Sequence, residues 1–165
     1  MTGAAWTSRA IRRMATSRKR TLALLARLPD EAIRRPRTQD AWSIKDVLAH
    51  LGAWEAEGVR RLKLITRGQA DRVRFYDDMS EADRFNARAV AAGRRRSLPA
   101  TLKRLARVRA DLVAALRRLP ADALRDPAHR YPVVHWLPEF AWTHEESHER
   151  DIREWWRSAK HERRR

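Results

Sequence analysis

The sequence predicts an all-α protein, built as an up-and-down four-helix bundle with one extra short helix between the second and third long helices. Apolar residues recur at three- and four-residue spacing along four long stretches, which is the period of an amphipathic helix. Prolines and polar turn formers interrupt the chain between these stretches, as in the short connections of helix bundles. No stretch alternates with period two for long enough to predict a strand.

The first two long helices are expected on either side of a proline-rich connection. The first covers about residues 7–28 and ends at Pro29, after which one short turn is expected. The second has the clearest start signal, because Ser43 and Asp46 stand three residues apart, as in a capping box. An apolar stripe follows this start and extends to Ile65.

Three further helices are expected in the second half of the chain. The extra short helix begins at Ser80 and extends to about Ala92. The third long helix begins at Ser97 and ends before Pro120, which cannot continue a helix. The last long helix begins near residues 136–138 and runs to about residue 159.

The length and residue composition limit the classes of protein. The chain of 165 residues fits one domain, 1–165, with a short basic tail at about 160–165. It contains no cysteine, which excludes disulfides, thiolate ligands and a cysteine nucleophile. No run approaches the roughly 20 apolar residues of a membrane span, and no apolar signal segment follows the N-terminal arginines. We therefore expect a soluble cytoplasmic protein without a membrane partner.

The excess of positive charge makes nucleic acid a candidate partner. Lysine and arginine number 37 against 21 acidic residues, a formal net charge of +16. The arginines are spread over every expected helix, and no zinc-finger spacing, glycine-rich clamp or helix-turn-helix pattern accompanies them. We therefore expect most of them to form a solvated face, and nucleic-acid binding is not favoured.

Two histidines lie on the apolar stripe of the last expected helix. His144 and His148 are about 40° apart on that helix, at about 100° per residue. A buried imidazole must satisfy two ring nitrogens, and two histidines one turn apart can share a metal ion. The alternatives are a surface pair without a role and a hydrogen-bonded pair in the core.

Two more residues are candidates for the same site. Asp151 lies on the face of the histidine pair and is a candidate general base or ligand-orienting carboxylate; a salt bridge with a neighbouring arginine is the alternative. His50 lies at one edge of the stripe of the second helix, roughly 90° from its centre. That position fits either a ligand that reaches into a groove between helices or a half-exposed histidine without a role.

Several motifs resemble a known family. The stretch AWSIKDVLAHLGAWE at residues 41–55, with a distant pair of histidines four residues apart, resembles the DinB-like superfamily of four-helix bundle proteins. The segments LPDEAIRRPRTQDAWSIKDVLAHL, FNARAV, RRLPADAL and IREWW are most similar to its ClbS/DfsB-like branch. The resemblance implies a homodimer, and a divalent metal (zinc first, nickel or iron as alternatives) held by His50, His144 and His148.

The resemblance also implies a class of chemistry. Members of the superfamily include thiol-dependent transferases and isomerases, and three imidazoles with an open position are the donor set of a catalytic zinc site. We therefore expect a metal-dependent hydrolase or thiol transferase that acts on an electrophilic small molecule in detoxification or stress response. Asp151 would be its catalytic carboxylate and a low-molecular-weight thiol a cosubstrate. The alternative is a non-catalytic protein that sequesters a toxic small molecule or binds a polyanion.

Overall fold

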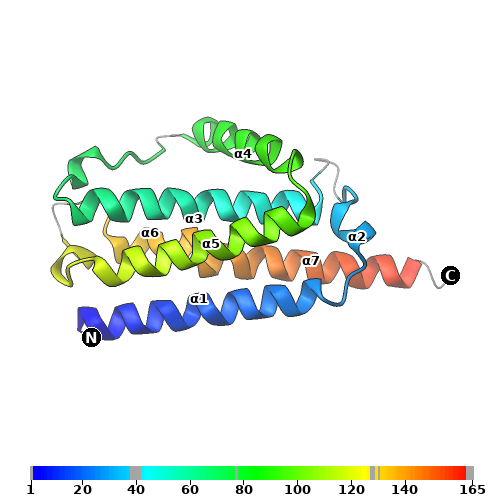
Figure 1. The fold of residues 1–165 in the computed structure, drawn as a ribbon, viewed down its shortest axis with the longest axis horizontal. Coiled ribbons are helices and arrows are strands. Elements are labelled where there is room, and N and C mark those ends of the chain that lie inside the picture. The colour runs from blue at the N-terminus through cyan, green and yellow to red at the C-terminus, as the bar shows by residue number, and fades with distance from the viewer. Residues whose placement is uncertain (1, 38–41, 77, 127–128, 130, 163–165) are drawn as a thin grey trace.

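The computed structural model describes residues 2–37, 42–76, 78–126, 129 and 131–162, and the regular secondary structure in these ranges is helical. The predicted all-α class is therefore confirmed, while residues 163–165 of the expected basic tail lie outside the described residues. Four long helices lie side by side (Figure 1): α1 (Gly3–Leu25), α3 (Ile44–Thr66), α5 (Leu98–Arg118) and α7 (Trp142–Glu162). Shorter elements connect them: α2 (Asp30–Arg34), η1 (Ala70–Arg72), α4 (Met79–Arg94), η2 (Asp122–Leu124) and α6 (Val133–Phe140).

The third long helix runs parallel to the second. Gly52 of α3 packs beside Leu105 of α5, and Gly58 packs beside Leu112, so residue numbers rise together along the two helices. Helix α4 explains this direction, because it carries the chain back along α3 before α5 begins (Figure 1). The extra helix lies where we expected it, but the order of directions differs from the alternating up-and-down order that we expected.

Side-chain caps set the starts of the later helices. The expected capping box is present: the Ser43 hydroxyl accepts from the Asp46 N–H, and the Asp46 carboxylate accepts from the Ser43 N–H. Helix α4 begins earlier than expected, because the Asp78 carboxylate caps it by accepting from the Glu81 N–H at 2.9 Å. Ser80, the start that we expected, instead donates its hydroxyl to Asp78.

The first connection also differs from its expected form. Helix α1 begins at Gly3, with Thr2 as its N-cap, and ends at Leu25, a few residues before the expected end. The following segment forms the short helix α2 where we expected one turn. Pro29 stands at its N-cap with extended backbone angles, and two acidic residues in the first turn complement the positive helix end.

The expected last helix is divided into two helices at Ala141, whose backbone angles (φ −118°, ψ −95°) are not helical. The last carbonyls of α6 are satisfied locally: the Ala141 N–H donates to the carbonyls of Leu137 and Pro138, and the Thr143 hydroxyl donates to the Pro138 carbonyl at 2.7 Å. Local hydrogen bonds of this kind compete with helix continuation. As a result, α7 starts two residues before His144.

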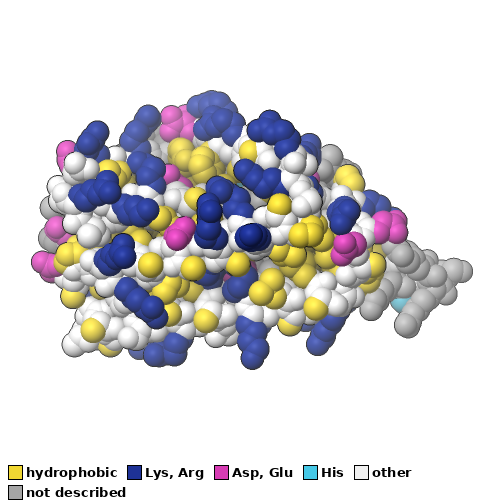
Figure 2. Space-filling model, viewed as in Figure 1, with side chains coloured by type: hydrophobic (Ala, Val, Ile, Leu, Met, Phe, Trp, Pro, Cys, Tyr) yellow, Lys and Arg dark blue, Asp and Glu magenta, His cyan; other side chains and the backbone are white. Residues whose placement is uncertain are grey.

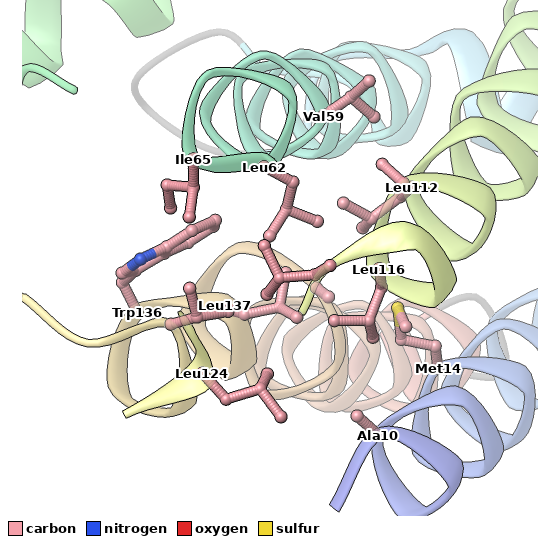
Figure 3. Close-up of a cluster of buried hydrophobic side chains, with 14 of the residues drawn as sticks. Ala10, Met14, Val59, Leu62, Ile65, Leu112, Leu116, Leu124, Trp136 and Leu137 are labelled. Atoms are coloured by element: carbon pink, nitrogen blue, oxygen red, sulfur yellow. The ribbon is translucent and has the colours of Figure 1, made fainter. Parts of the chain in front are cut away.

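Buried apolar side chains form two clusters along the bundle. Figure 3 shows the first cluster, in which Leu62, Leu112, Leu116 and Leu137 point toward one another from α3, α5 and α6. The second lies nearer the start of α3 and is built from residues of α1, α3, α5 and α7 together with the first connection. Its buried members are Leu24, Leu25, Leu28, Ile33, Ile44, Val47, Leu48, Leu51, Leu98, Leu105 and Ile152.

A buried layer of charged side chains separates the two clusters. Each long helix contributes one residue: Arg18, Glu55, Arg109 and Glu145. Arg18 contacts Glu145 at 2.6 Å and Glu55 at 2.7 Å, and Arg109 pairs with the same two carboxylates. Because the two positive and two negative groups are hydrogen-bonded to one another, their burial is compensated.

The face of the molecule drawn in Figure 2 carries many basic side chains without one concentrated stripe. Figure 2 shows lysine and arginine side chains distributed over the visible face, with apolar and a few acidic side chains between them. The solvated role that we expected for these side chains stays a prediction. Among the described helices, none combines the length and the apolar character that crossing a membrane requires.

Candidate metal centre

Three histidines from two helices converge on one point of the bundle. The Nε2 atom of His144 lies 2.9 Å from Nε2 of His50 and 3.1 Å from Nε2 of His148. His50 comes from the second turn of α3, and the other two come from successive turns of α7. The ligand atoms of the three histidines all lie within 4.8 Å of one another, which is close enough for them to share a metal ion. Among the described His, Cys, Asp and Glu residues, these three form the group that meets this condition.

The cluster favours neutral imidazoles. Burial, followed by the nearby His144 and His148, lowers the pKa of His50 to about 3. Burial, followed by the charge of His148, lowers the pKa of His144 to about 4. Burial also lowers the pKa of His148, and the negative charge of Asp151 opposes this shift. All three rings are therefore neutral near pH 7, the form in which histidine binds metals.

The donor set fits a divalent cation. Two nitrogens bound to zinc at about 2.0–2.1 Å in tetrahedral geometry stand about 3.3 Å apart, close to the two separations observed here. The Nδ1 atoms of His50 and His144 are buried and have no hydrogen-bond partner among the described residues. One lone pair on His144 cannot accept well from two N–H groups at once, whereas a cation satisfies all three Nε2 atoms. A shared cation therefore accounts for the close approach of the three Nε2 atoms, which hydrogen bonding alone explains poorly.

Comparison with known families identifies the chain. The model of the DinB superfamily matches residues 13–152, which include all three histidines. The chain belongs to the DinB superfamily. No curated protein and no solved structure matches it. The superfamily expected from the motifs is confirmed, and its ClbS/DfsB-like branch stays a prediction.

Helix α4 of this DinB-superfamily protein brings an amide to the cluster. The Asn86 carbonyl oxygen accepts a hydrogen bond from the Trp54 indole N–H at 3.0 Å, and the same side chain lies close enough to the His50 ring to oppose the lowering of its pKa. Nothing in the sequence pattern around Asn86 indicates a chemical role for it. Its position depends on how α4 packs on α3. The helical period of the sequence does not predict this packing.

Arg37 is a second residue that the sequence analysis missed. Its backbone N–H donates to the Trp42 carbonyl at 3.1 Å, beside an isolated antiparallel bridge between Pro36 and Ser43. The Trp42 ring packs against the ring of His50, with centroids 5.1 Å apart. Arg37 is half-buried, and its charge lowers the pKa of His148, so the guanidinium lies within electrostatic reach of the site. The residue stands in a proline-containing connection that pattern alone marks only as a linker.

Asp151 lies on the exposed side of α7, one turn after His148. Burial lowers the pKa of both His148 and Arg37, and the negative charge of Asp151 opposes this lowering in both. Asp151 therefore lies near the histidine cluster. The alternative that we considered for it is not observed, because it forms no salt bridge with a described arginine. Its catalytic role stays a prediction.

Other side chains near the cluster have structural partners. Glu145, which follows His144 in the chain, is fully buried between Arg18 and Arg109. Trp54 belongs to a half-buried aromatic cluster with Tyr76, Phe85 and Phe140. Trp155 packs against the second apolar cluster.

A cavity of about 710 Å³ lies elsewhere in the molecule. Ile65, Phe75, Tyr131 and Trp136 contribute to its walls, and none of the three clustered histidines does. Ile65 is about 15 residues from His50 along α3, or about 22 Å at about 1.5 Å per residue. The cavity is therefore separate from the histidine cluster.

Proposed function

We propose that this protein is a metal-dependent enzyme in which His50, His144 and His148 hold one divalent transition metal. The observation that supports this proposal most strongly is the approach of three neutral Nε2 atoms to one point. Membership of the DinB superfamily adds support, because metal binding is common in it. Three imidazoles and an open position suit zinc best, and the same donors accept nickel or iron.

The proposed reaction is hydrolysis of, or thiol transfer to, an electrophilic small molecule. A metal bound at this site supplies a Lewis acid and lowers the pKa of a bound water or thiol. Since the chain has no cysteine, a thiol nucleophile has to come from a low-molecular-weight cosubstrate. Asp151 would accept the proton that the water or thiol releases, because its carboxylate is exposed and lies one turn from His148.

The cofactor proposal is tested by elemental analysis of protein purified without a histidine tag or chelator. The wild type should contain about one equivalent of a single transition metal, and His144→Ala should lose it. His135→Ala is the matched control, because His135 is exposed on α6 and lies outside the cluster. Full occupancy in the His144 variant, or no metal in the wild type after reconstitution, would contradict the proposal.

We also propose that the protein forms the homodimer that the family resemblance implies. Light scattering should then give a mass of about twice the 19.3 kDa of one chain. A mass equal to that of a single chain across the micromolar range would contradict this.

A further inference from the structure

We propose that Arg37 binds a carboxylate group of the small molecule that enters the metal centre, an inference that rests on the proposed function. Such a molecule would carry a metal-binding donor, such as a thiol, and a carboxylate a few bonds away. Arg37 would then determine which substrates or cosubstrates the protein accepts.

Backbone contacts with the start of α3 hold Arg37 beside the histidine cluster. Its backbone is bonded to the Trp42 carbonyl at 3.1 Å, and the adjacent Pro36 pairs with Ser43. Trp42 in turn packs on the ring of His50. Two backbone interactions and one ring contact therefore connect Arg37 to a proposed ligand. The residue has a defined position beside the site, which an arginine on an unsupported surface loop would lack.

The Arg37 guanidinium has no hydrogen-bond or ion-pair partner among the described residues. Its Nε atom is buried without a hydrogen bond, and no described carboxylate lies within ion-pair distance. Two other arginines of the same region are paired: Arg34 contacts Asp30 at 3.0 Å, and Arg94 contacts Asp46 at 3.4 Å. A half-buried guanidinium with five donors loses hydration without compensation unless a ligand supplies acceptors.

The net charge around the histidine cluster also favours an anionic ligand. The charged or titratable groups that act on Arg37 are His148, which is neutral near pH 7, and Asp151, whose carboxylate is near but not paired with it. Three neutral imidazoles around a divalent cation, with the opposite charges of Arg37 and Asp151 nearby, leave a net positive site. That charge favours an anionic molecule over a neutral one.

The chemistry of the guanidinium defines the expected ligand. Its planar fork of N–H groups matches the two oxygens of a carboxylate, which arginine binds in a bidentate manner. A phosphate group offers similar oxygens. The experiment therefore has to separate a carboxylate from both a neutral group and a phosphate.

The test uses cobalt-loaded protein, in which binding of a thiol at the metal changes the visible absorption. We would titrate mercaptoacetate and its neutral methyl ester into the wild type, Arg37→Gln and Arg35→Gln. Arg35 is the matched control, because it is exposed in the same connection. For each protein, we would divide the dissociation constant of the ester by that of mercaptoacetate. An intrinsic difference in metal affinity between the two thiols affects every protein equally, so it cancels when these ratios are compared.

We expect the dissociation constant of the ester, divided by that of mercaptoacetate, to be about tenfold larger in the wild type than in Arg37→Gln. The ratio in Arg35→Gln should equal that of the wild type. Arg37→Lys should restore part of this preference, since it keeps the charge and loses the fork. Inorganic phosphate should compete with mercaptoacetate only weakly; equal competition at equal concentration would overturn the assignment to a carboxylate. Normal cobalt binding with an unchanged preference in Arg37→Gln would overturn the role of Arg37 alone. Failure of the wild type to bind cobalt would overturn the proposed metal site and this inference with it.

Discussion

Arg109 of α5 and Glu145 of α7 form a buried ion pair, with Nη2 of the arginine 2.7 Å from Oε2 of the glutamate. Glu145 directly follows His144 in the chain, so this pair and the matching contact from Arg18 hold the first turn of α7 at a defined position. The charged layer therefore acts on the histidine cluster through the backbone, because it helps to set where His144 stands relative to His50.

Replacing Glu145 by glutamine should destabilise the protein strongly. The change leaves Arg18 and Arg109 buried without one of their two carboxylates, and breaking a buried pair costs about 3–5 kcal/mol. Urea denaturation measures the free energy of unfolding. Glu146→Gln is the control, because Glu146 pairs with the exposed Arg13 and should cost under about 1 kcal/mol. Equal effects of the two variants would show that the layer does not stabilise the fold.

The same pair should make stability depend on acid. Burial alone would raise the pKa of Glu145, but Arg18 and Arg109 outweigh it and the pKa is lowered below its ordinary value of 4.5. A carboxyl group with a lowered folded-state pKa stabilises the protein above its unfolded pKa, and this contribution is lost as the pH falls through the folded value. The difference in stability between wild type and Glu145→Gln should therefore shrink below about pH 4.5. A difference that stays constant down to pH 3 would contradict this.

The metal-free protein should lose stability on acidification through its histidines. The pKa of His50 is lowered to about 3 in the folded state, against 6.5 ordinarily, so the unfolded chain binds more protons between these values. Stability from this group is complete above about pH 6.5 and falls as the pH decreases toward 3. Denaturation in the presence of chelator at pH 7 and pH 5 should show a smaller loss for His50→Gln than for the wild type. His135→Gln, which changes an exposed histidine, should keep the wild-type loss.

A methyl group at Gly93 should separate α4 from α3. A Cβ atom built there would overlap the Cβ of Ala49, the residue that precedes His50. Overpacking of this kind costs about 1–3 kcal/mol, more than the helix propensity that alanine gains. Gly52→Ala is the matched control, because its Cβ would meet only Leu105 at an ordinary 3.5 Å. The predicted order of stability is Gly52→Ala above Gly93→Ala, measured by thermal unfolding, and the reverse order would contradict the close approach.

Asn86 should affect metal affinity without being a proposed ligand. Asn86→Leu removes the acceptor of the Trp54 indole and a polar group beside His50. Loss of a residue that orients a metal-binding histidine weakens metal affinity by about 10–100-fold. Competition with a chromophoric chelator measures this affinity, with Ala87→Leu on the exposed face of α4 as the control. Equal affinities in the two variants would leave Asn86 with a packing role only.

Asp151→Asn should separate turnover from metal retention. If Asp151 accepts a proton in the reaction, the variant should keep about one equivalent of metal and lose roughly 10²–10⁴-fold in kcat. Glu154→Gln is the control, an exposed carboxylate one turn nearer the C-terminus. A panel of activated esters and thiol-reactive electrophiles supplies the assay. Unchanged kcat in Asp151→Asn would remove this residue from the mechanism.

Local features of the chain determined the helices and part of the site. The helical period predicted the all-α class, and hydrogen bonds within one turn predicted the start of α3 at Ser43. The pairing of His144 with His148 follows from their spacing on one helix, since residues four apart share a face. His50 was assigned to the same site through the family motif, because its own helical position left its role open.

Only the tertiary structure decided how distant segments meet. The direction of α5, the position of Asn86 beside His50, and the approach of Arg37 to the site depend on contacts between separate elements. The charged layer was likewise not predicted, because a charged residue on each helix reveals nothing about its partners on the other three. Helical periodicity shows which face of a helix is buried. The residues on that face acquire partners through packing, which joins parts of the chain that are far apart in sequence.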